Sequence, residues 1–296
     1  MSDRIPVGDF KYYDDENDTN YIQKHFNWAI SGELAQYILS SQDKIENEGY
    51  FYECDLEYPK ELHSYHHDLP LCPVHEERIN GKLCATLHPK RNVVLHYKLL
   101  DCYLRHGLKL TKIHRIISFR EKRIYDDWVK LKVKNRMNAR KIGNTFISDK
   151  EKNECIAVFG KSIENKKNHL DVKVATNEKQ CLRYNSDPLI ENIKIINENL
   201  VMYLMKKKGF IENKPIFLGA TILALAKVQY YDLYYNHIKR YYGNDVRFIY
   251  GDTDSFVLEI NKPRKDVEED FNGVLHEVID YNKTGELGKL KIEDWP

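Results

Sequence analysis

The sequence has no long hydrophobic run, no excess charge of either sign and no closely paired cysteines. No run of about 18 apolar residues is present, so no transmembrane helix and no membrane partner are expected. The N-terminal residues 1–6 contain no apolar core of the kind found in signal peptides. The six cysteines include no Cys-x-x-Cys pair, and a reduced intracellular compartment, nucleus or cytoplasm, is the default expectation.

The charges almost cancel over the 296 residues, with 46 Lys and Arg against 45 Asp and Glu. A nucleic-acid role therefore cannot depend on overall basicity and needs a local basic patch. Hydrophobic residues make up 42% of the chain, which is enough for one large or two small globular domains with a real core.

The most informative stretch is residues 250–255, Tyr-Gly-Asp-Thr-Asp-Ser. The flanking residues 246–249 and 256–260 are rich in β-branched and aromatic side chains and predict two strands, while Gly-Asp-Thr is typical of a turn. Asp252 and Asp254 would repel each other at such a tip unless cations lie between them. Their oxygen ligands favour Mg²⁺ or Mn²⁺, and paired ions of this kind serve nucleotidyl transfer. The alternative is a surface hairpin with solvated acids.

A second informative stretch is residues 130–141, which hold six basic residues and no acid. These are Lys130, Lys132, Lys134, Arg136, Arg140 and Lys141. Such a run can be a solvated helix face. A phosphate-facing surface is the other interpretation, because Lys152 and Lys161 follow shortly after it.

Further elements follow from periodicity and capping residues. We expect strands at 49–59, 91–97, 108–119 and 172–175, and helices at 21–40, 98–106, 121–165 and 220–242. Residues 1–47 are otherwise polar and mixed, and a polar stretch extends from 176 to about 200.

Residues 60–90 are rich in histidine and cysteine. The pairs Cys72 with His75 and Cys84 with His88 nearly match the spacing of zinc ligands, although Pro70 suggests an irregular loop of ordinary residues. A zinc-dependent nuclease built on this loop is the weaker hypothesis, because no general base accompanies these residues at a fixed spacing.

Residues 250–255 resemble the C motif of family B DNA polymerases. Residues 159–165, Phe-Gly-Lys-Ser-Ile-Glu-Asn, resemble the second half of the B motif in the protein-primed group of Maverick/Polinton-type elements, related viruses and linear plasmids. Lys152 falls on the lysine that contacts the incoming triphosphate in that family. Residues 57–63, 108–115 and 214–217 are also similar to the family, in the same order along the chain.

The resemblance implies an α+β fold, with a polymerase palm of antiparallel sheet and helices plus helical fingers. It places a partial palm at 1–96, a fingers-like helical region at 97–205 and the rest of the palm at 206–296. The exonuclease domain, motif A and thumb are expected to be missing, so that the chain is truncated at both ends. Asp55 has the wrong spacing for motif A, and Ile156 stands where the family has asparagine.

The resemblance implies a DNA-directed DNA polymerase that would be inactive as this chain alone; the alternative is a non-catalytic DNA-binding remnant. Mg²⁺ or Mn²⁺ would bind the catalytic Asp252 and Asp254, and deoxynucleoside triphosphates would be the substrates. DNA template-primer, and a priming terminal protein, would be the partners. Nucleotide-binding residues would be Lys152, Arg140, Lys141, Phe159, Gly160 and Tyr250. DNA-binding residues would be Lys130, Lys132, Lys134, Arg136 and Lys161.

Overall fold

The computed structural model describes residues 3–40, 46–76, 81–141, 160–164, 171–206, 209, 214–252, 255–282 and 289–292. The chain forms two compact units. Unit 1 comprises Met1–Lys134 and Ala220–Pro296, and unit 2 comprises Asn135–Gly219. The structure confirms the expected mixture of helices and antiparallel sheets.

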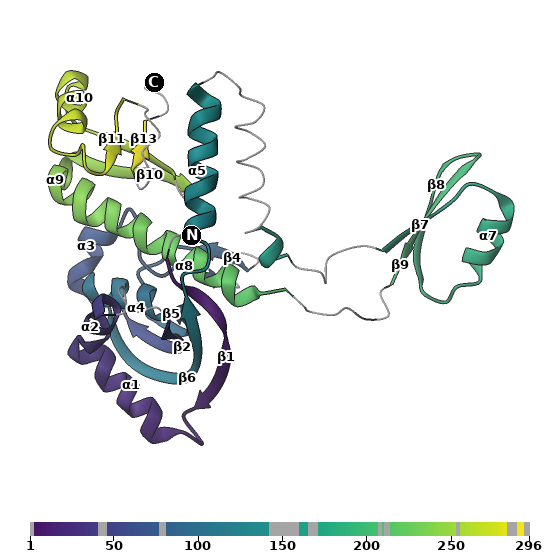
Figure 1. The fold of residues 1–296 in the computed structure, drawn as a ribbon, viewed down its shortest axis with the longest axis horizontal. Coiled ribbons are helices and arrows are strands. Elements are labelled where there is room, and N and C mark those ends of the chain that lie inside the picture. Colours follow the sequence, from purple (N-terminus) through teal and green to yellow (C-terminus); the bar gives the residue numbers. More distant parts are fainter. Residues whose placement is uncertain are drawn as a thin grey trace. The chain divides into compact units, whose positions relative to one another are not determined.

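A four-stranded antiparallel sheet forms the centre of unit 1 (Figure 1). Its strands, in spatial order, are β1 (Ile5–Asp14), β6 (Lys109–Lys122), β2 (Glu46–Glu57) and β5 (Lys90–His96). Strand β2 pairs with both β6 and β5, so it lies inside the sheet. Alternate residues of β2 therefore reach the core, and the buried ones include Tyr50, Tyr52, Cys54 and Leu56.

Aromatic rings join this sheet to three helices on one of its faces. The helices are α1 (Thr19–Ser31), α2 (Glu33–Ser40) and α4 (Tyr97–Arg105). The Tyr50 ring lies between one aromatic residue of each helix, with centroid distances of 4.7 Å to His25, 6.0 Å to Tyr37 and 6.3 Å to Tyr97. Several of the 21 tyrosines of the chain thus help to build a core.

One expected helix is two helices in the structure. The sequence predicts a single helix over 21–40, whereas α1 ends at Ser31 and α2 begins at Glu33, and Gly32 between them has a φ of 84°. A left-handed residue ends a helix, and glycine adopts that conformation without steric cost. Helix α4 ends in the same way, with Gly107 at a φ of 95°, as its sequence predicts.

The second half of unit 1 is built on a long helical run. Helix α8 (Ile216–Asp232) begins in unit 2 and continues as a π-helical segment (Leu233–Lys239), α9 (Arg240–Tyr242) and a 3₁₀ turn (Gly243–Asp245). By length and composition, residues 216–245 could cross a membrane. The core of unit 1 buries part of this run, including Tyr231, Tyr234, Tyr235 and Ile238.

The remaining elements of unit 1 are short. They are a 3₁₀ turn (Lys60–Leu62), α3 (His63–His66), β3 (Val74–Glu76), β4 (Lys82–Cys84), β10 (Val246–Asp252), β11 (Ser255–Ile260), α10 (Arg264–Asn272), β12 (Ile279–Asp280) and β13 (Leu290–Lys291). Strands β10 and β11 form an antiparallel hairpin, as predicted. Strands β12 and β13 pair in parallel.

Unit 2 contains a small antiparallel sheet covered by one helix (Figure 1). The strands lie in the order β7 (Asp171–Ala175), β9 (Leu200–Met205) and β8 (Ile190–Asn197), and the helix is α7 (Glu178–Asn185). Their core consists of Ala175, Tyr203 and Met205, with Cys181 and Tyr184 of α7 packed against it. Helix α5 (Asp126–Lys141) begins in unit 1 and ends in unit 2.

Two parts of the fold differ from the sequence prediction. The predicted fingers-like helical region at 97–205 contains β6, which belongs to the sheet of unit 1, and the three strands of unit 2. The predicted polar stretch from 176 to about 200 contains α7 and β8. Many side chains of β8 point to solvent, and a strand that is exposed along its length lacks the regular alternation that reveals a strand.

Candidate functional site

The hairpin formed by β10 and β11 brings an acidic tip to the surface of unit 1. Asp252 pairs with Ser255 as the last described residue pair of the antiparallel ladder. Asp252 is exposed, and its backbone carbonyl accepts a hydrogen bond of 3.1 Å from the Ser255 hydroxyl. Tyr250, the other site residue predicted on this strand, is 59% exposed. Both residues are thus accessible to a ligand.

Helix α8 closely supports the hairpin tip through Tyr230. A Cβ atom on Gly251 would collide with the Tyr230 hydroxyl, so only glycine permits this approach. The same hydroxyl donates a hydrogen bond of 3.4 Å to the backbone carbonyl of Ser255. Burial raises the pKa of Tyr230, and the negative charge of Asp252 raises it further. The phenol therefore stays protonated beside the acidic tip.

The two faces of the hairpin differ. Phe256 packs on α8, 4.4 Å from the Tyr230 ring centroid, and Phe248 packs on the π-helical segment, 5.6 Å from the Tyr234 ring centroid. On the opposite face, Ile249 and Val257 are exposed. The hairpin is thus fixed to the helix by aromatic rings on one face only.

A buried carboxylate holds the base of the hairpin. The Asp68 Oδ2 atom accepts hydrogen bonds from the Tyr234 hydroxyl at 2.6 Å and from the backbone N–H of Phe248 at 3.2 Å. The Lys239 ammonium lies 3.3 Å from the same oxygen, with side-chain exposures of only 6% for Lys239 and 3% for Asp68. Asp68 thereby ties together the loop before β3, the π-helical segment and β10.

In unit 2, the segment predicted to resemble a B motif is tied to the beginning of α8. Lys161 Nζ lies 2.6 Å from Glu164 Oε1, and Lys214 Nζ lies 3.1 Å from Glu164 Oε2. These two lysines lower the pKa of Glu164 to about 2. Gly219 lies so close to the Ile163 side chain that an added Cβ would overlap it. Lys161, a predicted DNA contact, is therefore paired within the protein.

The predicted basic patch falls on one helix. All six basic residues of 130–141 belong to α5. Lys130 and Lys134 are exposed, and Lys130 Nζ lies 3.5 Å from Asp126 Oδ2 in a surface pair. The predicted contact residues Lys132, Arg136, Arg140 and Lys141 also lie on this helix.

Three predicted site residues lie outside the described residues: Asp254, Lys152 and Phe159. Gly160 is described and exposed at the beginning of a short helical turn. Ile156, which departs from the family pattern, also lies outside the described residues.

The histidines and cysteines of residues 60–90 do not converge on one point in the described part of this loop. His66 is buried and bonded to the Tyr58 hydroxyl at 2.9 Å. Cys72 is buried in the core cluster, and His75 contacts the Gly81 carbonyl at 2.6 Å. At these positions the side chains therefore pack in the core or form hydrogen bonds, and they do not form the zinc site considered for this loop.

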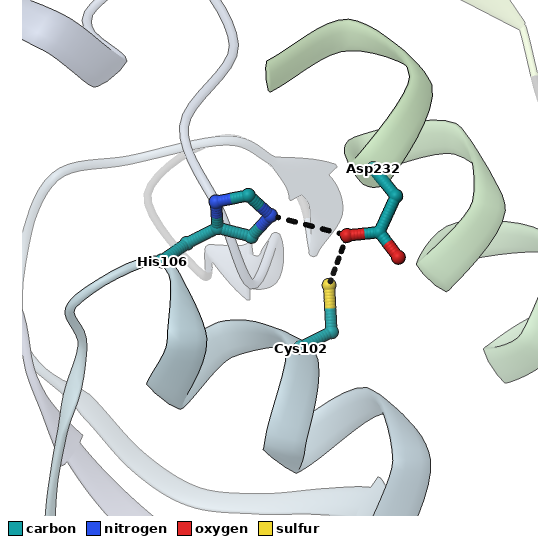
Figure 2. A group of neighbouring side chains, drawn as sticks. All are labelled: Cys102, His106 and Asp232. Atoms are coloured by element: carbon teal, nitrogen blue, oxygen red, sulfur yellow. Dashed lines mark hydrogen bonds and ion pairs between the residues drawn. The ribbon is translucent and has the colours of Figure 1, made fainter. Parts of the chain in front are cut away.

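A different group of metal-ligand types meets elsewhere in unit 1. Cys102 on α4, His106 just after α4 and Asp232 on α8 place one ligand atom each within 4.8 Å of one another. Figure 2 shows the three side chains pointing toward a common point. Among the residues that the structure describes, this is the group whose geometry could hold a metal ion.

No protein-family model, curated protein or solved structure matches the chain.

Sequence reasoning missed the residues that hold the hairpin in place. Tyr230 and Tyr234 are four residues apart on a predicted helix, and this spacing is the local signal that both face the hairpin. Asp68 has no such signal, because its hydrogen bond to Phe248 spans 180 residues of sequence.

Proposed function

We propose that this chain is the palm and fingers part of a family B DNA polymerase, which performs template-directed nucleotidyl transfer. The observation that carries the proposal is the acidic tip of the β10–β11 hairpin, fixed on a long helix and open to solvent at Asp252. The string of residues 250–255 at this tip is the most specific part of the resemblance. Unit 2, inserted between the two halves of unit 1, holds the B-motif-like segment and corresponds to the fingers in this proposal.

The residues at the tip suit a hard divalent cation. Asp252 and Asp254 offer carboxylate oxygens, which Mg²⁺ and Mn²⁺ prefer. A metal ion bound there would neutralise charge on the triphosphate during transfer of the nucleotide to the primer hydroxyl. The exposed ring of Tyr250 would pack beside the primer end and the new base pair.

The basic residues have a separate role in this proposal. Lys152, Arg140 and Lys141 would bind the triphosphate, with Phe159 and Gly160 beside the nascent base pair. Lys130, Lys132, Lys134, Arg136 and Lys161 would contact the DNA backbone, where positive charge provides affinity without sequence preference. The ion pair of Lys161 with Glu164 would have to open, or be shared with a phosphate, for that contact to form.

Primer extension tests the enzymatic proposal. The protein is assayed with primer-template, deoxynucleoside triphosphates and Mg²⁺ or Mn²⁺, both as this chain and with the residues that its reading frame encodes before Met1. We expect no incorporation by this chain alone, whereas the extended form should show incorporation that follows the template and is lost in Asp254→Asn and Asp252→Asn. Asp245→Asn, at the other end of β10, is the matched control and should retain activity. Incorporation that survives both tip substitutions, or no incorporation by either form, would refute the proposal.

A DNA-binding protein without catalysis is the second candidate function, and the basic helix α5 favours it. Binding should be independent of sequence and should weaken steeply with salt, because each neutralised phosphate contributes a slope of about −0.9 in log K against log salt. Replacing Lys130 and Lys134 with alanine should make this slope shallower by about one to two units. The exposed Lys24 and Lys60 provide a control pair with the same change in net charge. Equal slopes in both variants would show that α5 does not contact DNA.

A further inference from the structure

A compact group of thiol, imidazole and carboxylate joins two helices of unit 1. Cys102 is fully buried, and the His106 side chain is 9% exposed. The Asp232 side chain is 30% exposed, so the group is open to solvent on the carboxylate side. Cys102 and His106 are four residues apart and therefore project from the same side at the end of α4.

The distances within the group fit a metal ion better than direct hydrogen bonds. The Asp232 Oδ1 atom lies 3.4 Å from His106 Nε2 and 3.9 Å from Cys102 Sγ. Charge-assisted N–H···O bonds are shorter, at about 2.7–2.9 Å. Tetrahedral zinc bonds of about 2.0–2.3 Å would separate N from O by about 3.3–3.5 Å and S from O by about 3.5–3.7 Å.

One oxygen of Asp232 has an unusual number of neighbours. Besides His106 and Cys102, the Oδ1 atom accepts from Asn236 Nδ2 at 2.9 Å and lies 3.4 Å from Arg105 Nη1. The Arg105 guanidinium is also held by Asp101 at 2.9 Å, so it does not depend on Asp232 for a counter-ion. A carboxylate has a second oxygen that can accept these donors while the first binds a metal.

The charges of the group balance when a divalent ion is bound. A thiolate and a carboxylate together carry two negative charges, which Zn²⁺ neutralises, and Arg105 is neutralised by Asp101. Thiolate and imidazole ligands favour zinc over Mg²⁺ and Mn²⁺, which prefer oxygen. The ligand set therefore differs in kind from the acidic tip of the hairpin.

We propose that Cys102, His106 and Asp232 bind a zinc ion that fastens α4 to α8. Water would take the fourth ligand position, on the exposed side of Asp232. The ion would thus link the helix beside the four-stranded sheet with the helix that carries the hairpin. With three protein ligands and a water the site would be of the open type, and its link between the two helices is independent of the proposed polymerase function.

Metal analysis of the purified full chain tests the proposal. The wild-type protein should retain about one zinc per chain after dialysis, as expected for a site with three protein ligands. Cys102→Ala and Asp232→Asn should each weaken zinc binding more than about 100-fold, because even outer-shell changes at zinc sites cost 10- to 100-fold. Cobalt added to the apo protein should give a thiolate-to-cobalt absorption band that is absent in Cys102→Ala.

Two variants provide the controls. Cys54→Ala removes a thiol that is as fully buried as Cys102, so it creates a similar cavity and should leave zinc binding unchanged. Cys84→Ala tests the histidine- and cysteine-rich loop. The nearly isosteric Asp232→Asn keeps the test valid if Cys102→Ala does not fold. Wild-type protein that binds no zinc, or zinc that is lost in Cys84→Ala and kept in the Cys102 and Asp232 variants, would overturn the proposal.

Discussion

Asp68→Asn should remove most of the electrostatic support of the hairpin while nearly preserving the shape of the side chain. Asparagine can still accept from the Tyr234 hydroxyl and the Phe248 N–H, but it carries no charge. The ammonium of Lys239, with only 6% of its side chain exposed, would then lack its ion-pair partner.

The expected loss of stability is large. Removing one partner of a buried ion pair costs about 3–5 kcal/mol, because the remaining charge stays desolvated. For a unit of this size each kcal/mol lowers Tm by about 2–4 °C, so we expect a decrease of roughly 6–20 °C. Asp15→Asn is the matched control. Its carboxylate lies 2.9 Å from Lys112 Nζ, but the two side chains are 35% and 53% exposed, and exposed pairs contribute about 0–1 kcal/mol.

Thermal unfolding and urea unfolding, both followed by circular dichroism, measure the Tm and the free energy of unfolding of both variants. A further change of Lys239→Met in the Asp68→Asn background should recover much of the loss, because it removes the unpaired charge. Burial raises the pKa of Asp68, but the bonds from Tyr234 and Phe248 and the charge of Lys239 together lower it below its usual value. The advantage of the wild type should therefore be complete above about pH 4 and shrink as pH falls through the pKa of the folded protein. A loss no larger than that of Asp15→Asn would refute this account of Asp68.

Two further predictions concern the core and the hairpin tip. Burial lowers the pKa of His25 to about 4, so its contribution to stability is complete above about pH 6.5 and declines as pH falls toward 4. His25→Gln should reduce the loss of stability over this range by up to about 3 kcal/mol in urea titrations, and identical pH profiles would contradict the prediction. Gly251→Ala should increase hydrogen exchange of the hairpin amides, because the new methyl group collides with the Tyr230 hydroxyl. Tyr230→Phe should partly restore protection, and no restoration would mean that another neighbour causes the effect.

The regular elements of unit 1 could largely be predicted from local patterns. The strand expected at 49–59 is observed as Glu46–Glu57, and the helix expected at 220–242 lies within the helical run that begins at Ile216. Strand β1 was not predicted, because it is an edge strand whose pairing is irregular at Gly8 and Asp9, both at positive φ, and whose exposed residues include the aromatic Phe10 and Tyr12. Its position depends on pairing with β6, which lies about a hundred residues later in the chain.

The candidate sites also differ in how far the sequence predicts them. The hairpin is local, so residues 246–260 were enough to predict its strands and its turn. The group of Cys102, His106 and Asp232 required the tertiary fold, because His106 and Asp232 are 126 residues apart. The spacing of four residues between Cys102 and His106 on a predicted helix indicates that these two side chains lie on one side of it. Asp232 is added as the third residue of the group only by the packing of α8 near α4.

Unit 1 consists of two segments of the chain with unit 2 between them, and this arrangement affects folding during synthesis. The core of unit 1 joins residues near the N-terminus with the helical run after Ala220, and Asp68 bonds to Tyr234 across 166 residues. Synthesis proceeds from the N-terminus, so the ribosome must finish unit 2 before the second half of unit 1 exists. The first half then has exposed apolar surface throughout that interval. Nascent chains stalled before residue 220 lack the second half of unit 1 and should therefore bind chaperones. Chains that have been synthesised beyond residue 282 and released contain it and should not bind them.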